Sequence, residues 1–231
     1  KKKKKGFITI NDMTRMNLQK KFLAPFAPRI LVTNIEDYVV NRINNFADNR
    51  ENAKNIGATL AGQIEDETEI TDSEMDSIGI KSIFLDLGRH YVHSIFEQNN
   101  THFGLKKYSA DNVDISVECT SAWFVNQKEN EYNPIHNHTN CTISAVLYLQ
   151  LPEFAPRQYK GKNNIDGRIE FIHSTVDHSL LSKGTFMTLP TIGQLFMFPS
   201  TLLHAVYPFQ GSGTRRSLAF NLNYALIEKQ M

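Results

Sequence analysis

Three histidines are placed where together they could bind one metal ion. His136 and His138 are separated by one residue and precede an apolar run, and His204 lies in a later run of strand-like composition. In an extended chain, residues two apart project to the same face, so the first two imidazoles form a natural chelate. Three imidazoles suit iron, copper, nickel or zinc, whereas magnesium and calcium prefer oxygen ligands. The spacing therefore predicts a transition-metal site.

An arginine and a serine in the last predicted strand suggest a binding site for an anion. Arg215 and Ser217 share the parity of small and polar residues, whereas the other parity of this strand is apolar. We expect the apolar face to pack on helices, which leaves the polar face to line a pocket. A buried arginine is costly unless it meets an anion, and its planar fork matches a carboxylate. Arg216 has the other parity and is expected outside the pocket.

These residues lie in motifs that resemble the non-haem iron(II)- and 2-oxoglutarate-dependent oxygenases. The order of His136-x-His138, His204 and Arg215-x-Ser217 matches that family, over about residues 120–225. The resemblance is to the branch found in bacteria and marine phages, through the stretches WFVN at 123–126, HNH at 136–138, SAVLYL at 144–149, FPSTLLHAVYP at 198–208 and RRSLAFN at 215–221. It implies a double-stranded β-helix, or jelly roll, that binds Fe(II).

The resemblance also implies an activity and a cosubstrate. The family uses Fe(II), 2-oxoglutarate and O2, and it couples the release of succinate and carbon dioxide to attack on a C–H bond of a substrate. Arg215 and Ser217 would hold the far carboxylate of 2-oxoglutarate, and Asn126 and Tyr148 are further candidates for contact with it. The primary substrate, a protein side chain such as proline or a small molecule, is left open.

One residue departs from the family pattern. His136 and His204 match the two histidine ligands, but His138 stands where the family has Asp or Glu. Either His138 binds the metal directly, or water, a halide or a carboxylate from elsewhere fills that place. A cupin-like three-histidine dioxygenase without an oxoacid is therefore an alternative, which His138 favours and Arg215 disfavours. A non-catalytic jelly-roll binding module with structural zinc is another.

The elements that must position these residues follow from the periodicity. Apolar residues at helical spacing predict helices over residues 35–53 and 72–98, the second opened by a capping box at Thr71–Glu74. Alternation and turn residues then predict strands over 113–123, 141–151, 168–173, 185–189, 194–198, 202–208 and 215–225. Helices followed by strands indicate an α+β chain with N-terminal helices packed on a jelly-roll core.

We expect one domain over residues 1–231, with a helical part at 1–110 and the metal-binding jelly roll at 111–227. A polar insertion at 152–166 is expected to shape the mouth of the site. The oligomeric state cannot be inferred from the sequence.

Composition excludes several other classes. The chain has 231 residues, 41% of them hydrophobic, and two cysteines, Cys119 and Cys141, which make no disulfide framework. No apolar run reaches the roughly 18 residues of a membrane span, and no signal peptide is visible. We therefore expect a cytoplasmic protein, in the host cytoplasm if viral, without a membrane partner. The run Lys1–Lys5 is compatible with nucleic-acid binding, but we favour a solvated end and expect no nucleic-acid partner.

Overall fold

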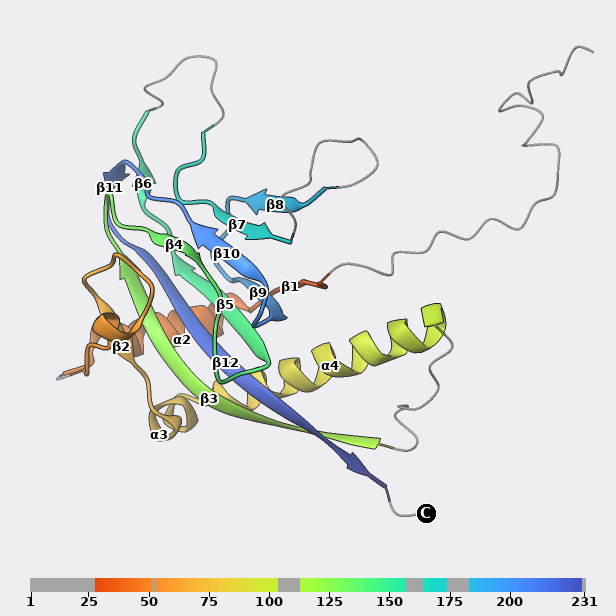
Figure 1. Ribbon diagram of the computed structural model, residues 1–231. Helices are drawn as coiled ribbons and strands as arrows, with labels where there is room; N and C mark the ends of the chain where they lie inside the picture. Colours follow the sequence, from red (N-terminus) through yellow and green to blue (C-terminus); the bar gives the residue numbers. More distant parts are fainter. Residues whose placement is uncertain (1–27, 52, 104–112, 157–163, 174–182, 230–231) are drawn as a thin grey trace, which may run out of the picture.

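Two antiparallel sheets face each other in the computed structural model, which describes residues 28–51, 53–103, 113–156, 164–173 and 183–229 (Figure 1). The large sheet has the order β1 (Leu31–Asn34), β9 (Gln194–Pro199), β5 (Ile143–Gln150), β12 (Arg215–Glu228), β3 (Val113–Gln127) and β2 (Glu67–Glu69). The small sheet has the order β4 (Asn133–His136), β10 (Leu203–Val206), β7 (Ile169–Ile172) and β8 (Thr185–Thr188). A further pair joins β6 (Glu153–Phe154) to β11 (Gly211–Ser212). The predicted jelly-roll class is confirmed.

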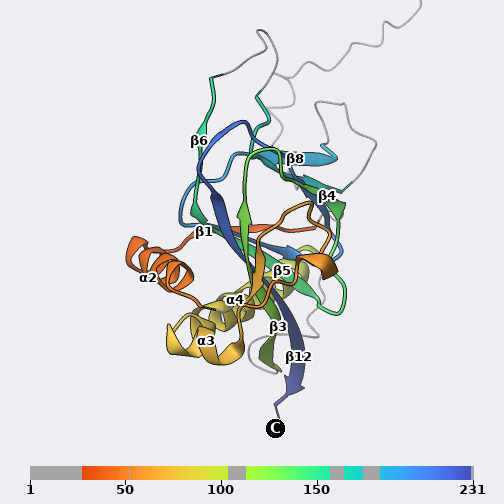
Figure 2. The same cartoon turned by 90° about the vertical axis from the view of Figure 1, so that its left-hand side faces the viewer.

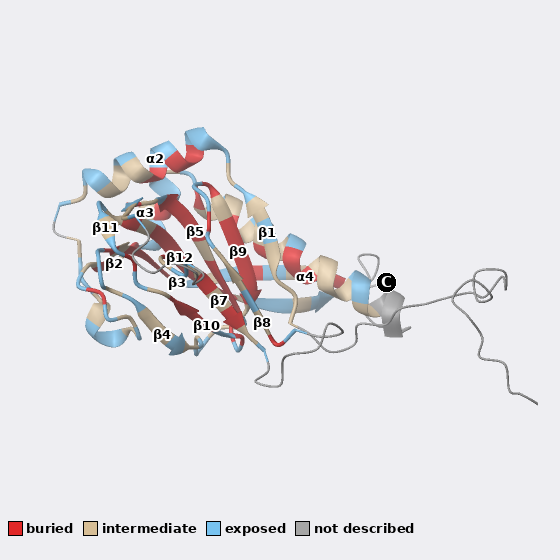
Figure 3. Cartoon of the chain, turned by 90° about the horizontal axis from the view of Figure 1, so that it is seen from above, coloured by how far each residue is buried: buried red, intermediate tan, exposed pale blue. Residues whose placement is uncertain are grey.

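Helices cover the outer face of the large sheet (Figures 1 and 3). They are α2 (Asp37–Asp48), α3 (Asp72–Ser77) and α4 (Lys81–Phe103), and a short 3-10 turn, η1 (Gly57–Thr59), follows α2. Phe84 of α4 stacks on Phe220 of β12, with ring centroids 4.1 Å apart. Leu218 and Leu222 join the same buried cluster, so the apolar parity of β12 meets the helices as predicted. None of the helices described is long and apolar enough to cross a membrane.

The helices differ from the predicted ones at their ends. The predicted helix over 35–53 ends at Asp48, and the one over 72–98 is two helices, α3 and α4. Gly79 causes this break, because its φ of +63° lies in the left-handed region, which a side chain disfavours. The predicted capping box is present, with reciprocal hydrogen bonds between Thr71 and Glu74.

The first 110 residues also supply strands that the periodicity did not predict. β1 and β2 are the two edge strands of the large sheet. A third unpredicted strand, β4, lies later in the chain, has four residues and contains Pro134. Each is too short to show an alternating pattern on its own. Lys1–Lys5 and residues 157–163 of the predicted insertion lie outside the described residues.

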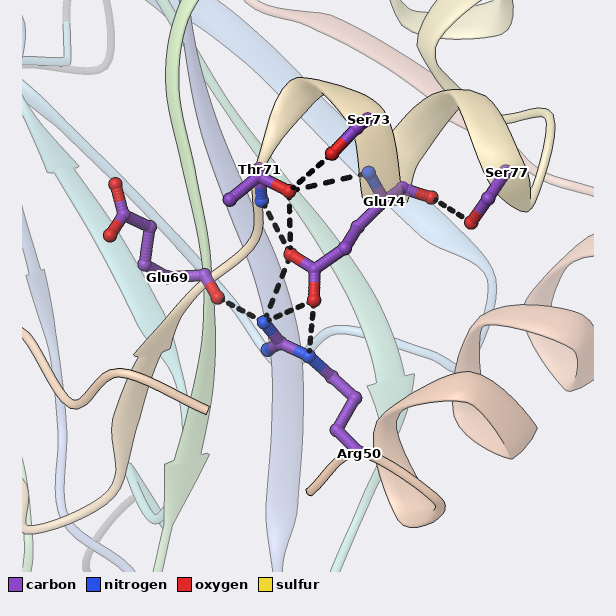
Figure 4. Close-up of polar contacts among 6 residues, drawn as sticks. All are labelled: Arg50, Glu69, Thr71, Ser73, Glu74 and Ser77. Carbon is purple, nitrogen blue, oxygen red and sulfur yellow. Dashed lines mark hydrogen bonds and ion pairs between the residues drawn. The ribbon is translucent and has the colours of Figure 1, made fainter. Parts of the chain in front are cut away.

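Arg50 holds β2 against its neighbours (Figure 4). Its guanidinium donates to both carboxylate oxygens of Glu74, at 2.9 and 3.1 Å, and to the backbone carbonyl of Glu69. It also lies near the rings of Phe46 and Phe124, 5.4 and 5.6 Å from their centroids. One buried cation thus ties the end of α2 and the start of α3 to the edge strand β2.

We expect Arg50→Ala to lower the free energy of unfolding by about 2–3 kcal/mol, because the substitution leaves the half-buried Glu74 carboxylate without its cation and the Glu69 carbonyl without its donor. Urea denaturation measures this change. The matched control is Arg89→Ala, which removes an exposed i,i+3 pair with Asp86 and should cost less than about 0.5 kcal/mol. Equal losses in the two variants would contradict the role given to Arg50.

Candidate active site

The small sheet brings the three predicted histidines together. His136 of β4 and His204 of β10 are direct partners across the two strands, and His138 follows two residues after β4 ends. The three side chains each offer a ring nitrogen, and these nitrogens lie within 4.8 Å of one another. This is close enough for one ion to contact all three. Among the described residues, this group of donors contains no carboxylate.

Hydrogen bonds fix the same tautomer in all three rings. Nδ1 of His136 lies 2.7 Å from the carbonyl oxygen of Pro134, and Nδ1 of His204 lies 2.9 Å from that of Leu202. Since a carbonyl oxygen only accepts, each Nδ1 must carry the hydrogen, which leaves the lone pair on Nε2. This is the arrangement in which metal-binding histidines are usually held.

Asn221 plays the corresponding part for His138. Its Oδ1 lies 2.8 Å from Nδ1 of His138 and also accepts from the Ser144 hydroxyl, while its Nδ2 donates to the Ser121 hydroxyl. These contacts orient the amide, so that its oxygen faces the imidazole. The sequence placed Asn221 on the polar parity of its strand but gave it no role. The hydrogen bond with His138 shows that Asn221 orients this imidazole.

Burial keeps the imidazoles neutral. It lowers the pKa of His138 to about 4 and that of His204 to about 3, and the neighbouring imidazole of His136 adds to both shifts. The pKa of His136 is lowered by the same loss of solvation. Neutral rings keep the lone pairs that a metal ion needs, so the chemistry of this donor set fits the transition metal that the spacing predicts.

A buried guanidinium lies in the facing sheet. Arg215 of β12 is 1% exposed, and it donates from Nη1 to Oε1 of Gln127, at 2.9 Å. Its Nε and Nη2 are buried without a hydrogen-bond partner, and the described residues provide no carboxylate in ion-pair range. A charged fork with free donors is an anion receptor, because an uncompensated buried charge is otherwise costly.

Tyr148 and Ser217 complete this receptor. They are direct partners across β5 and β12, and both are buried. The Arg215 guanidinium lies 4.6 Å from the centroid of the Tyr148 ring, and the Tyr148 hydroxyl has no partner among the described residues. The structure thus brings Arg215, Ser217 and Tyr148 together.

Asn126 is not part of this group. It lies opposite Arg216 across β3 and β12, on the face away from the receptor, and its side chain bonds to Arg216 and Asp66. The next residue, Gln127, has the opposite parity and contacts Arg215 in its place. The alternation of side chains along β3 predicts Gln127 on the cavity face, together with Trp123 and Val125. The expectation for Asn126 came from the resemblance of its motif to the family. Arg216 lies outside the pocket, as expected.

One cavity of about 330 Å³ connects the two groups. It is lined from the small sheet by His136, His204 and Val206 and from the large sheet by Trp123, Tyr148, Arg215 and Ser217. The segment around η1 lines one side through Ile56, Thr59 and Leu60. Gln63 of this segment pairs with Tyr132, just before β4, and Figure 2 shows the segment in orange near β4. Trp123 stacks near His138, with ring centroids 5.7 Å apart.

Glu67 is a functional candidate that the sequence did not reveal. It lies on β2, lines the same cavity and is 1% exposed, and its Oε2 has no partner among the described residues. Burial and the nearby Glu131 raise the pKa of its carboxyl to about 7. The residue lies in a segment without periodicity, so no local pattern marks it.

The raised pKa of Glu67 makes a testable contribution to stability. The unfolded carboxyl loses its proton near 4.5 and the folded one near 7, so stability is lost as the pH rises between these values. We expect wild-type protein to lose up to roughly 3 kcal/mol more than Glu67→Gln between pH 4.5 and pH 8. Urea denaturation at both pH values tests this. Glu65→Gln, whose side chain is exposed, should follow the wild type. Parallel profiles for wild type and Glu67→Gln would refute the shift.

Comparison with known proteins finds a family model that is similar to the jelly-roll core. Residues 121–221 match the family model described as "Putative 2OG-Fe(II) oxygenase". A comparison with curated proteins finds no match.

Solved structures show the same fold. HygX from Streptomyces hygroscopicus, with nickel, 2-oxoglutarate and hygromycin B bound, has a TM-score of 0.52 at 10% identity, and the match covers 84% of this chain and 82% of that one. AviO1 from Streptomyces viridochromogenes Tue57 has a TM-score of 0.51 at 10% identity, covering 84% and 89%. The resemblance drawn from the motifs is confirmed, while the bacterial and phage branch stays a prediction. Residues 121–221, which contain the three histidines, Arg215 and Ser217, are thus similar to the 2OG-Fe(II) oxygenase family.

Proposed function

We propose that this chain is an Fe(II)- and 2-oxoglutarate-dependent hydroxylase in which His136, His138 and His204 hold the metal. Arg215, Ser217 and Tyr148 then bind the far carboxylate of 2-oxoglutarate. The observation that carries the proposal is the buried Arg215 guanidinium, with two nitrogens lacking partners, in the same cavity as three neutral imidazoles. A dicarboxylate supplies both the anion that Arg215 lacks and a chelating end for the metal.

Each group of residues in the proposed site has its own role. Fe(II), when bound, would supply the redox chemistry that couples decarboxylation of 2-oxoglutarate by O2 to C–H hydroxylation. Gln127 aims the Arg215 guanidinium, and Tyr148 covers one face of it. Hydrogen bonds to Nδ1 hold the three rings with Nε2 free. The apolar walls of the cavity, among them Trp123, Val125 and Phe198, limit the access of water.

We further propose that residues 1–231 act as one domain. The edge strands β1 and β2 come from the first 110 residues and extend the sheet of the jelly roll. The segment around η1 and the first residue of β2 line the cavity together with the core. A jelly-roll fragment without them would lack one wall of the site.

A dioxygenase that needs no oxoacid is the second candidate. The three-histidine donor set favours it, because no carboxylate stands among the donors in the described residues. Such an enzyme has no use for Arg215, whose buried charge would then lack a partner. Binding of 2-oxoglutarate separates the two candidates.

We expect Arg215→Ala to lower 2-oxoglutarate affinity by roughly 100-fold or more, because the variant removes the buried partner of a carboxylate. Calorimetric titration with Ni(II) present measures the affinity, and succinate release with Fe(II), ascorbate and O2 measures turnover. Metal binding should persist, and fluorescence of Trp123, the single tryptophan, reports it from beside His138.

The matched control for this experiment is Arg216→Ala. It removes the neighbouring positive charge, which lies outside the cavity and pairs with Asp48. Its 2-oxoglutarate affinity should stay within about twofold of the wild type, since only long-range electrostatics change. Unchanged affinity in Arg215→Ala, or no succinate from the wild type, would overturn the proposal.

We expect Asn221→Ala to weaken metal binding by about 10- to 100-fold, because His138 loses the acceptor that fixes its tautomer. Quenching of Trp123 fluorescence by Ni(II) measures the affinity. The control is Asn223→Ala, in the same strand but beyond the β-bulge and outside the cavity lining. If Asn221→Ala bound nickel as tightly as this control, then His138 would not be a ligand.

A further inference from the structure

The position of Glu67 is determined by the pairing of β2 with the sheet. Glu67 lies opposite Val125 of β3, Val125 lies opposite Ser217 of β12, and Ser217 lies opposite Tyr148 of β5. Direct partners in antiparallel strands project to the same face, so all four side chains face the cavity. Glu67 and Ser217 are two strand spacings apart, roughly 10 Å. The acid and the anion receptor therefore lie at opposite ends of one row.

The carboxyl of Glu67 has none of the partners that a structural acid needs. Its Oε2 is fully buried without a hydrogen bond, and no cation among the described residues lies in ion-pair range. The charged neighbour that affects it is Glu131, which has the same sign. Glu74, in the same region, is the contrast: Arg50 and Thr71 bind its carboxylate on both sides. An acid that stabilised the fold would resemble Glu74.

The backbone of the covering segment packs closely against this carboxyl. Gly62 approaches so closely that a Cβ there would lie 2.9 Å from Glu67 Oε2 and 2.7 Å from Asn133 Oδ1. Two oxygen acceptors from different strands, β2 and β4, thus lie against the backbone of Gly62 and close to each other. Asn133 also lines the cavity, and it lies on β4, the strand that carries His136.

The walls beside Glu67 are apolar. Trp123, Val125 and Ala219 form a buried cluster with Ile64, and Ile56 and Leu60 of the covering segment pack against it. A ligand in this part of the cavity would meet hydrocarbon and aromatic surface on its sides and two oxygen acceptors at one end. Such a surface binds an apolar body that carries a hydrogen-bond donor.

We propose that Glu67 and Asn133 form a subsite for a cationic nitrogen of the primary substrate, an amine carried on an apolar body. This inference rests on the proposed function and names the substrate class for it. A cation fits better than a neutral donor, because the carboxylate has no compensating charge and its charged neighbour is negative. The cavity is then divided by charge, with the dicarboxylate at Arg215 and the amine at Glu67.

Cyclohexylammonium and cyclohexanol are suitable probes, because they share an apolar ring and differ in charge at the head group. Calorimetric titration of the full chain with Ni(II) and 2-oxoglutarate at pH 8 gives their two affinities. We expect wild-type protein to bind the ammonium at least about tenfold more tightly than the alcohol. In Glu67→Gln this ratio should fall to near one. Glutamine has the shape of the neutral acid, so the variant should fold.

The matched control is Glu65→Gln, which removes one negative charge from an exposed side chain two residues away. It should keep the wild-type ratio, whereas a general attraction of cations to this surface would lower the ratio in both variants. Equal affinities for the two probes in wild-type protein, or a preference that persists in Glu67→Gln, would overturn the inference. The same titration separates the two proposals: 2-oxoglutarate that binds without an ammonium preference contradicts the subsite alone, and 2-oxoglutarate that does not bind contradicts the proposed function.

Discussion

The pairing of His136 with His204 is the constraint on which the site depends. These residues are opposite each other in β4 and β10, and the remaining ring, His138, follows two residues later. A slip of one residue between the two strands would turn one imidazole to the outer face. The register is held from the other side by β7, whose buried Phe171 is also a partner of His204. The face that carries the three histidines is therefore a property of the small sheet as a whole.

The two faces of the large sheet have different roles: one stabilises the fold, and the other lines the cavity. On β12, Leu218 and Phe220 pack into the helical layer, while Arg215 and Ser217 face the cavity. The first set stabilises the fold through apolar burial, and the second set introduces polar groups without partners, which cost stability. One strand can carry both because successive side chains point to opposite faces. The helices α2 and α4 are thus needed by a site that they do not touch.

Much of this arrangement could be predicted from local patterns. Alternation placed Arg215 and Ser217 in the pocket, and i,i+2 spacing paired His136 with His138. The cosubstrate contact of Asn126 was expected from the motif alone. Side chains alternate along β3, so Asn126 projects to the face opposite to that of Val125 and Gln127. Glu67 could not be found, because β2 has three residues and exists only through its pairing with β3. Contacts of this kind depend on chain segments nearly 60 residues apart, which no periodicity records.

In the proposed site, a histidine at the position of the family's carboxylate ligand changes the charge of the whole cavity. Three neutral imidazoles leave a divalent ion with its full charge, and Arg215 adds another positive charge. The ion and Arg215 together carry three positive charges, and a bound dicarboxylate would neutralise two of them. A carboxylate ligand in place of His138 would have neutralised the third. One remaining positive charge in the cavity would stabilise the Glu67 carboxylate, by about 1.7 kcal/mol for a separation of roughly 10 Å and an effective dielectric constant of 20. The loaded cavity therefore favours ionised Glu67 more than the free protein does, and it favours this form before any amine arrives. In the proposed site, the negative charge that is missing because His138 replaces an acidic ligand is thus supplied by the buried Glu67 carboxylate on β2.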